Sequence, residues 1–310
     1  MNILISTSSF ARYSREPLNR LEGWGASYCL NAKGRKLTEE EIASLLGDVD
    51  GLIAGTEPLT RNVLRQAPRL KVISRCGTGL DNVDLDAAAE LGIDVRNTPE
   101  AHVDAVAELT LAAILDVLRH VTESDRGVRN GEWRKLMGRL LRGKTVGLIG
   151  LGRVGRRLIE LLEPFEVAIL ATDPREDREY ADGRGVEYVN LDDLLERADV
   201  VSLHCPYSEG IRHLIDAGRL GRMRPGAVLV NCARGGLVDE EALAEALRSG
   251  SIGGAHIDTF EREPYEGPLT QVHNVTLTPH IGSYAVEGRV RMEREAVENL
   301  IESMSNGGRE

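Results

Sequence analysis

Residues 144–155 read Lys-Thr-Val-Gly-Leu-Ile-Gly-Leu-Gly-Arg-Val-Gly, and this stretch decides the fold. An apolar strand runs into a GxGxxG turn with glycines at 150, 152 and 155, and a helix follows. In a dinucleotide-binding unit these glycines allow a tight turn, close approach of the backbone to a pyrophosphate, and close packing of helix on strand. The free N–H groups at the start of the helix favour an anion. Glycine clusters often form simple turns, so the neighbouring sequence decides whether this one binds a dinucleotide.

The context is a second apolar strand that ends in an acid. Residues 166–171 follow the helix, and Asp173 comes 18 positions after Gly155. A carboxylate there accepts both ribose hydroxyls of NAD and repels the 2′-phosphate of NADP. Arg175, two positions later, leaves some tolerance of NADP open. We therefore expect NAD as the cofactor.

Short apolar runs alternate with helical patterns on both sides of this stretch. A capping box, Thr38-Glu39-Glu40-Glu41, opens one of the helices. Such alternation predicts parallel sheets covered by helices, an α/β protein with two Rossmann-like or flavodoxin-like domains and a cleft between them. The expected strands are 2–7, 51–54, 71–75 and 92–95, then 144–149, 166–171, 199–203, 227–231, 252–257 and 275–277.

The domain boundaries are expected where the alternation pauses. One long, largely apolar helix is predicted over 103–127, followed by a basic, irregular segment, 131–143, that reads as a connecting or subunit-contact arm. The last helix, 286–304, has no place in the second series of strands and is expected to return to the first domain. The prediction is a substrate domain of residues 1–98 and 284–310, with an NAD-binding domain, 99–283, inserted.

Charge and composition restrict the partners. The 310 residues include 38 basic and 49 acidic side chains, a net charge of −11, which disfavours nucleic acid and anionic membranes as partners. No apolar run approaches the roughly 18–20 residues of a membrane span. The four cysteines show no metal-ligand spacing, so we expect no metal, no structural disulfide and a reducing, cytoplasmic location.

Four polar segments directly follow predicted strands of the second series. They are His204–Pro206, Asn231–Gly236, Asp258–Pro264 and Thr278–Gly282. Because the carboxyl ends of parallel strands share one edge of a sheet, these segments should meet where a cofactor binds.

The segments contain the groups that oxidation of a 2-hydroxy acid requires. The fork of Arg234 suits a carboxylate and the carbonyl next to it. His280 suits transfer of the hydroxyl proton, since an imidazole titrates near neutrality. Glu263 suits the far imidazole nitrogen, where a carboxylate would fix the tautomer.

Simpler interpretations exist for each of these residues. Considered alone, Arg234 and Glu263 could each form a surface ion pair, and His280 could be a buried histidine of the core. Asp258 suits either the nicotinamide end of the cofactor or a local cap. Cys205 and Cys232 have no neighbours that mark them as nucleophiles, and packing is the expected role.

The motifs together resemble the D-isomer-specific 2-hydroxyacid dehydrogenase family. They are CGTGLDNVD at 76–84, GLGRVG, HCP, NCARGG, DTFEREP and PHIG, in the family's order across nearly the whole chain. The resemblance implies NAD-dependent oxidation of a D-2-hydroxy acid, with Arg234 binding substrate, Glu263 supporting the histidine and His280 as acid/base. It also implies a homodimer or a tetramer joined through the nucleotide domain, and we expect the homodimer.

The resemblance assigns further residues to the two ligands. The NAD site would comprise Thr78, Gly150, Gly152, Arg153, Val154, Gly155, Asp173, Cys205, Pro206, Cys232, Ala233, Asp258 and Gly282. The substrate, a small anionic 2-hydroxy or 2-keto acid, would contact Gly77, Thr78, Gly79, Arg234 and His280. Arg75 is a further candidate from its own position at the end of a predicted strand, with a solvated surface arginine as the alternative. The turn at 77–79 would offer N–H groups to its carboxylate.

Within the family the motifs are most similar to phosphoglycerate dehydrogenases, in a short form without the carboxyl-terminal regulatory domain. D-3-phosphoglycerate is thus the expected substrate, which implies a role in serine biosynthesis, and Arg75 with Arg12 or Arg15 would bind its phosphate. Glu57 would repel a dianion if it pointed inward. The alternatives are another 2-keto acid (glyoxylate, hydroxypyruvate or a sulfonated analogue) and an NAD-binding corepressor or sensor.

Overall fold

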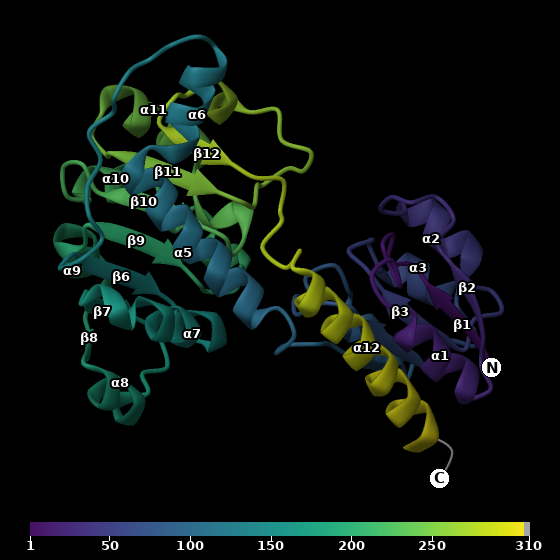
Figure 1. Cartoon of the computed structure of the whole chain (residues 1–310). Coiled ribbons are helices and arrows are strands. Elements are labelled where there is room, and N and C mark those ends of the chain that lie inside the picture. Colours follow the sequence, from purple (N-terminus) through teal and green to yellow (C-terminus); the bar gives the residue numbers. More distant parts are fainter. Residues whose placement is uncertain (307–310) are drawn as a thin grey trace. The chain divides into compact units, whose positions relative to one another are not determined.

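The computed structural model describes residues 1–306, which form two compact α/β units (Figure 1). One unit is Met1–His102 with the chain from Tyr284 onward, and the other is Val103–Ser283. The sequence predicts the first boundary after residue 98, whereas in the structure residues 99–102 belong to the first unit. His102 contacts that unit, since its Nδ1 lies 2.9 Å from Oγ1 of Thr78. Each described unit contains one sheet in which all strand pairs are parallel.

The first unit contains a five-stranded sheet with the flavodoxin-like order β2-β1-β3-β4-β5. Its strands are β1 (Asn2–Ile5), β2 (Ser27–Leu30), β3 (Gly51–Ala54), β4 (Val72–Arg75) and β5 (Asp94–Arg96). The chain reverses its direction of growth between β1 and β3, which places a topological switch point at their carboxyl ends. Ligands of open α/β sheets bind at such points.

Successive strand residues of this sheet point to opposite faces, so helices cover both. Ile3, Ile5 and Ile53 pack with the α1 (Glu16–Gly23) and α12 (Val286–Asn306) side, while Leu4 and Leu52 pack on the other. That other face carries α2 (Glu39–Leu45), α3 (Arg61–Arg65) and α4 (Leu85–Glu90). The carboxyl-terminal helix is fixed to β4 by a hydrogen bond from Oγ of Ser74 to the carbonyl of Ala296, 2.7 Å.

The second unit contains a seven-stranded sheet in the order β12-β11-β10-β9-β6-β7-β8. Its strands are β6 (Thr145–Ile149), β7 (Ala168–Thr172), β8 (Val186–Tyr188), β9 (Val200–Leu203), β10 (Val228–Asn231), β11 (Gly254–Ile257) and β12 (Val275–Leu277). This is the Rossmann order with an added edge strand, and its switch point lies between β6 and β9. The two α/β sheets confirm the predicted fold class.

Helices cover both faces of the larger sheet (Figure 1). One face packs against α5 (Val103–Arg119) and α7 (Arg153–Leu162), and the other against α9 (Leu191–Arg197), α10 (Ala217–Arg222) and α11 (Glu240–Ser249). The remaining helices are α6 (Val121–Arg129) and α8 (Arg178–Arg184), with 3-10 turns η1 (Glu163–Phe165), η2 (Glu209–Ile211), η3 (Gly235–Leu237) and η4 (Pro268–Gln271).

The predicted helix 103–127 was wrong in one respect, since the structure divides it into α5 and α6 at His120. His120 has a left-handed φ of 53°, and the Asp116 carboxylate accepts the N–H of Thr122 at 2.7 Å. The Asp116 side chain thus takes the place of the backbone carbonyl that would accept this N–H in a continuous helix, and a new helix begins. Strands β2 and β8 were missed; both pair on one side only and lack a continuous apolar run.

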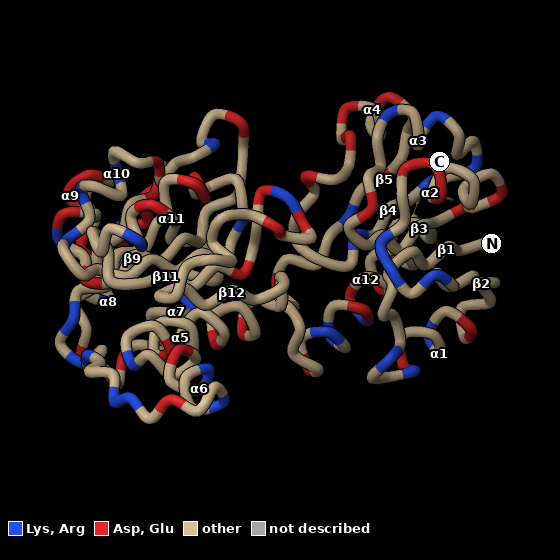
Figure 2. The backbone as a smooth tube through the Cα atoms, turned by 90° about the horizontal axis from the view of Figure 1, so that it is seen from above, with Lys and Arg blue, Asp and Glu red and all other residues tan. Residues whose placement is uncertain are grey.

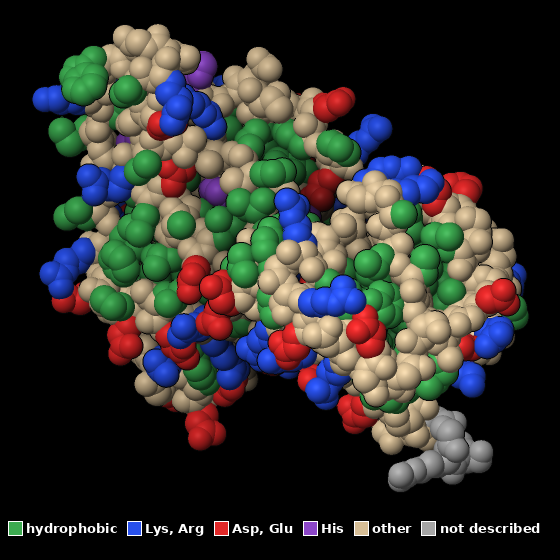
Figure 3. All heavy atoms as spheres, turned by 45° about the vertical axis from the view of Figure 1, so that its right-hand side comes forward, with side chains coloured by type: hydrophobic (Ala, Val, Ile, Leu, Met, Phe, Trp, Pro, Cys, Tyr) green, Lys and Arg blue, Asp and Glu red, His purple; other side chains and the backbone are tan. Residues whose placement is uncertain are grey.

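Charged residues of both signs are interspersed along the chain in each unit (Figure 2) and over the face shown in Figure 3. Many pair locally, as Arg197 does with Glu187 and Arg222 with Glu196. Within residues 1–306, no helix combines the length and apolarity needed to cross a bilayer.

Candidate active site

The GxGxxG turn leaves β6 at the switch point of the larger sheet. Gly150 has φ 98°, and a Cβ there would lie 2.8 Å from the backbone nitrogen of Cys205 at the end of β9. A Cβ at Gly155 would lie 2.8 Å from the carbonyl oxygen of Gly150. These two glycines therefore allow close packing of the turn.

Gly152 differs from its two neighbours in the motif. A Cβ at Gly152 would meet no described atom within 4 Å, so open space lies beside the backbone at the start of α7. No side chain among residues 1–306 caps this helix. An uncapped helix amino terminus with free space beside it fits a pyrophosphate, which agrees with the NAD expectation.

Asp173 lies directly after β7, as predicted. Its Oδ2 accepts the N–H of Leu151 and its Oδ1 that of Arg175, both at 2.8 Å. The carboxylate is thereby tied to the glycine turn, on the edge where the ribose next to the pyrophosphate is expected.

We expect Asp173→Ala to raise the KM for NAD and to shift the NAD-to-NADP preference by about 10²-fold, because the repulsion of a 2′-phosphate is lost. Steady-state kinetics with both cofactors measure the shift. Glu176→Ala, three residues along, should leave the preference unchanged. Equal effects of the two variants would contradict the assignment of Asp173.

The four polar segments that follow β9 to β12 lie on one edge of the sheet, as their strand positions predicted. His280 follows β12, and its Nδ1 lies 3.0 and 3.1 Å from the two carboxylate oxygens of Glu263, which follows β11. A carboxylate only accepts hydrogen bonds, so Nδ1 carries the proton and Nε2 is left as an acceptor. The side chains are 44% and 40% exposed, so solvent or a ligand reaches the pair.

Asp258 holds the segment that carries His280. Its carboxylate, fully buried, accepts the N–H groups of Ile281 and Gly282 at 2.8 Å and the hydroxyl of Thr278 at 2.6 Å. His280 has a left-handed φ of 56°, a conformation that such a set of bonds maintains. Asp258 therefore positions the histidine loop, and a contact with NAD remains a proposal.

Arg234 follows β10, and its loop packs against the loop that carries Glu263. A Cβ at Gly235 would lie 1.9 Å from the carbonyl carbon of Phe260, so only glycine allows this approach. The amide of Asn231 donates to the carbonyl of Arg234 at 2.8 Å and fixes the turn. The arginine, the carboxylate and the imidazole are thus carried by three adjacent loops of one unit.

The turn at 77–79 in the first unit differs in part from its expected role. The N–H of Gly77 is donated to Oγ1 of Thr98 at 2.9 Å, so it is not available for a substrate carboxylate. Thr78 and Gly79 remain as candidate donors. A Cβ at Gly77 would lie 1.7 Å from Nη1 of Arg75, so the guanidinium lies over this turn.

His204, Cys205 and Cys232, which follow β9 and β10, are unsuited to proton transfer or nucleophilic attack. Burial lowers the pKa of His204 to about 4, so the ring is neutral at physiological pH. Burial raises the pKa of Cys205 to about 11 and that of Cys232 to about 12, so both thiols stay protonated. The packing role expected for these cysteines agrees with the burial of Cys232 and the partial burial of Cys205.

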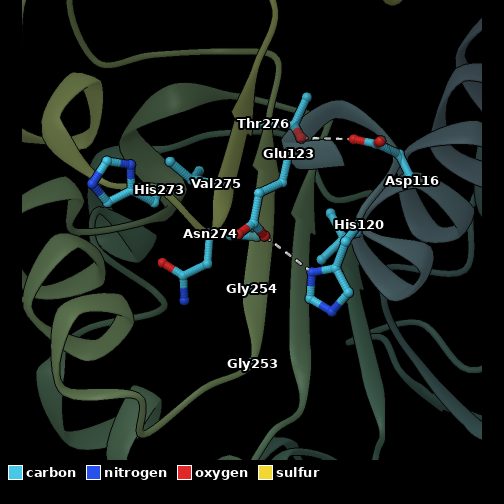
Figure 4. Close-up of a pocket in the computed structure, with 11 residues that line it drawn as sticks. Asp116, His120, Glu123, Gly253, Gly254, His273, Asn274, Val275 and Thr276 are labelled. Carbon is cyan, nitrogen blue, oxygen red and sulfur yellow. Dashed lines mark hydrogen bonds and ion pairs between the residues drawn. The ribbon is translucent and has the colours of Figure 1, made fainter. Parts of the chain in front are cut away.

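A small polar cavity lies at the opposite edge, where β11 and β12 begin (Figure 4). In it the hydroxyl of Thr276 donates to Asp116 at 2.6 Å, and Nδ1 of His120 lies 3.2 Å from Glu123. Its space of about 20 Å³ fits a water molecule rather than an organic ligand. Among the described residues no group of three or more His, Cys, Asp or Glu side chains is placed to hold a metal.

Sequence reasoning missed two residues of the first unit, Thr7 and Asn82. Thr7 follows β1 at the switch point, and its buried hydroxyl has no hydrogen-bond partner among residues 1–306. The sequence predicts a strand through Thr7, whereas β1 ends at Ile5 and leaves Thr7 in the loop that follows. The amide of Asn82 donates to the carbonyl of Glu57 at 2.7 Å, a long-range contact with no local sequence pattern.

Comparison with known proteins identifies relatives of several activities. The chain is 42% identical to a D-3-phosphoglycerate dehydrogenase of Methanocaldococcus jannaschii over 82% of its length, but spans only about half, 49%, of that relative. It is 43% identical to a glyoxylate reductase of Thermofilum pendens, with 85% of this chain and 81% of the relative covered. It is 37% identical to a hydroxypyruvate reductase of Thermotoga maritima, with 89% and 91% covered.

The fold of the chain matches a solved structure, and its nucleotide-binding unit matches a family model. A crystal structure of the TT0316 protein from Thermus thermophilus superposes with a TM-score of 0.91 at 36% identity, covering 99% of this chain and 97% of that one. Residues 111–282 match the model of the D-isomer specific 2-hydroxyacid dehydrogenase, NAD binding domain. The chain therefore belongs to the D-isomer specific 2-hydroxyacid dehydrogenase family, and it is an NAD-dependent oxidoreductase.

Proposed function

We propose that the chain interconverts a D-2-hydroxy acid and its 2-keto acid, with Arg234, Glu263 and His280 as the residues that act on the substrate. The observation that carries the proposal is the 3.0 Å bond between His280 and Glu263, on the sheet edge that also carries the glycine turn. It leaves Nε2 of the imidazole able to accept a proton.

In the direction of oxidation, Arg234 binds the substrate carboxylate and the oxygen at carbon 2 through its planar fork. Nε2 of His280 takes the proton of the hydroxyl group, and Glu263 stabilises the imidazolium that results. Bound NAD⁺ supplies the hydride acceptor. In the reverse direction the imidazolium returns its proton to the carbonyl oxygen.

The NAD site is assigned to the residues that the sequence motifs name. The start of α7, with the open space at Gly152, suits the pyrophosphate, and Asp173 suits the ribose hydroxyls. In the first unit, Thr78, Gly79 and Arg75 are assigned to the substrate carboxylate, since N–H groups and a guanidinium suit an anion.

Two substrate classes have support. D-3-phosphoglycerate, the substrate expected from the motifs, is supported by the relative from M. jannaschii, and serine biosynthesis would follow from it. Glyoxylate and hydroxypyruvate are supported by the names of two relatives and by the buried carboxylate of Glu57. We favour the second class, because a buried carboxylate disfavours a phosphate.

Oxidation of NADH with glyoxylate, hydroxypyruvate, pyruvate and 3-phosphohydroxypyruvate tests the proposal. Turnover of at least one 2-keto acid supports it. Binding of NADH without turnover of any of them would contradict it and favour the sensor. We also propose that the protein is cytoplasmic.

We propose further that a second copy covers the arm at 131–143. The arm has no helix or strand, and it exposes Trp133 by 85%, Met137 by 92% and Leu140 by 67%. Adjacent large apolar side chains exposed to this degree are typical of an interface.

Replacing both Trp133 and Met137 by glutamate should convert a dimer into monomers, because two charges would have to be desolvated at the interface. Light scattering after gel filtration measures the mass, and circular dichroism checks the fold. Leu30→Glu, an exposed position in the first unit, is the control. A parent chain that is already monomeric would contradict the proposal.

A further inference from the structure

We propose that Glu57 and Thr7 form a subsite for the substituent on carbon 3 of the substrate, and that this subsite accepts a hydroxyl group and excludes a phosphate. The inference rests on the proposed function and names its substrate class, 2-keto acids with an uncharged hydrogen-bond donor at carbon 3. Hydroxypyruvate is the simplest such acid. The subsite lies wholly in the first unit.

Glu57 is buried and held in one orientation. Only 1% of it is exposed, its Oε1 accepts the N–H of Gly55 at 3.0 Å, and the hydroxyl of Ser6 donates to the same oxygen. Both donors bind Oε1. A carboxylate has about four acceptor positions, so Glu57 still has the capacity to accept a bond from a ligand at Oε2.

Thr7 places a second polar atom within reach of the same glycine. A Cβ built on Gly55 would lie 2.9 Å from Oε2 of Glu57 and 3.7 Å from Oγ1 of Thr7, so both atoms border the same point above the glycine. Thr7 is 7% exposed, and its hydroxyl has no partner in the described chain. Buried hydroxyls are nearly always hydrogen-bonded, so an unpartnered one indicates a missing ligand or water.

The position in the sheet supports a ligand site. Thr7 follows β1 and Glu57 follows β3, the two strands between which the five-stranded sheet reverses its order. The carboxylate candidates Thr78 and Gly79 follow β4, the next strand. Asn82 connects the two turns, since its amide donates to the carbonyls of Gly55 at 3.4 Å and Glu57 at 2.7 Å.

The charged side chains that act on Cys76, which follows β4, are balanced in sign. Burial raises the pKa of the Cys76 thiol to about 11, and smaller effects come from the charges of Arg289, Glu293, Arg75 and Glu57. Two of these four side chains are cationic and two anionic, so their formal charges cancel. Arg289 is moreover bound to Glu293 at 3.0 Å.

A phosphorylated substrate brings a charge of about −1.5 to −2 in addition to its carboxylate. The Arg75 guanidinium lies over the turn assigned to the carboxylate, and Glu57 adds a negative charge at the neighbouring strand. A hydroxyl group, in contrast, can donate to Oε2 of Glu57 and accept from Thr7. Discrimination by an unfavourable charge is a common source of specificity.

The test compares kcat/KM for hydroxypyruvate, 3-phosphohydroxypyruvate and pyruvate, with NADH, in the parent chain and in Glu57→Gln. We expect the parent to prefer hydroxypyruvate over the phosphorylated acid by at least about 10²-fold, the scale of a like-charge contact. Glu57→Gln keeps the size and the acceptor for Ser6 and Gly55, and should reduce the preference by about tenfold or more.

Two further variants separate this effect from a loss of stability. Thr7→Val should lower kcat/KM for hydroxypyruvate about tenfold and leave that for pyruvate unchanged, and it removes no hydrogen bond that the structure contains. Asp50→Asn is the matched control, a buried carboxylate at the opposite, amino end of β3 that binds the N–H of Asn2 and Arg69. It should lower stability without changing the ratio of substrates.

The outcomes distinguish this inference from the proposed function. Turnover of 3-phosphohydroxypyruvate equal to or better than that of hydroxypyruvate, or the same ratio in the parent, Glu57→Gln and Thr7→Val, would overturn the subsite and leave the dehydrogenase standing. Turnover of no 2-keto acid by the parent would overturn both.

Discussion

Replacing His280 by alanine lowers kcat by about 10²–10⁴-fold, the usual contribution of a positioned acid/base. Without the imidazole, the proton of the substrate hydroxyl has no acceptor whose tautomer is fixed by Glu263. NAD binding should remain, because the glycine turn and Asp173 are untouched. Steady-state kinetics give kcat, and quenching of protein fluorescence by NADH gives the affinity.

His273→Ala is the matched control for this variant. His273 is an exposed imidazole of the same unit that lines the small cavity at the amino edge of the sheet, away from the carboxyl ends of the strands. It should keep the activity of the parent chain. A His280→Ala variant that binds NADH and retains near-normal kcat would contradict the assignment of His280.

Replacing Arg234 by lysine is expected to lower kcat/KM by about 10³-fold with the protein still folded. Lysine keeps the positive charge but loses the planar fork that binds two oxygens at once, so carboxylate and carbonyl are no longer held together. The loss should appear with every 2-keto acid, since all share these two groups.

Arg248→Ala is the control for Arg234, because Arg248 is an exposed arginine of the same unit that donates a long, 3.4 Å bond to the carbonyl of Pro268. Kinetics with a panel of 2-keto acids measure both variants. A small effect of Arg234→Lys, or an effect confined to one substrate, would mean that Arg234 does not bind the shared carboxylate.

The catalytic candidates were predictable because their position follows from strand ends alone. Asp258 directly follows an apolar run, and Thr278 follows the next, so parallel strands bring the loops of Glu263 and His280 to one edge without knowledge of any contact. The GxGxxG turn was also predictable, because the spacing of its glycines after an apolar strand is enough to indicate a tight turn into a helix.

Features that depend on long-range contacts were not predictable. The break at His120 depends on Asp116 reaching the N–H of Thr122, and helical periodicity continues through it. The N–H of Gly77 is occupied by Thr98, 21 residues away in the chain. The sequence could state that Glu57 would matter if it pointed inward, but its inward orientation involves a hydrogen bond from Ser6, 51 residues away in the chain.

The proposed reaction transfers a hydride directly from NADH to carbon 2 of a 2-keto acid, with a D-hydroxy acid as product. Reduction of hydroxypyruvate with NADH deuterated at the transferred position, followed by chiral chromatography and mass spectrometry of the glycerate, tests it most directly. We expect D-glycerate with one deuterium on carbon 2. L-glycerate, or glycerate without deuterium, would contradict it.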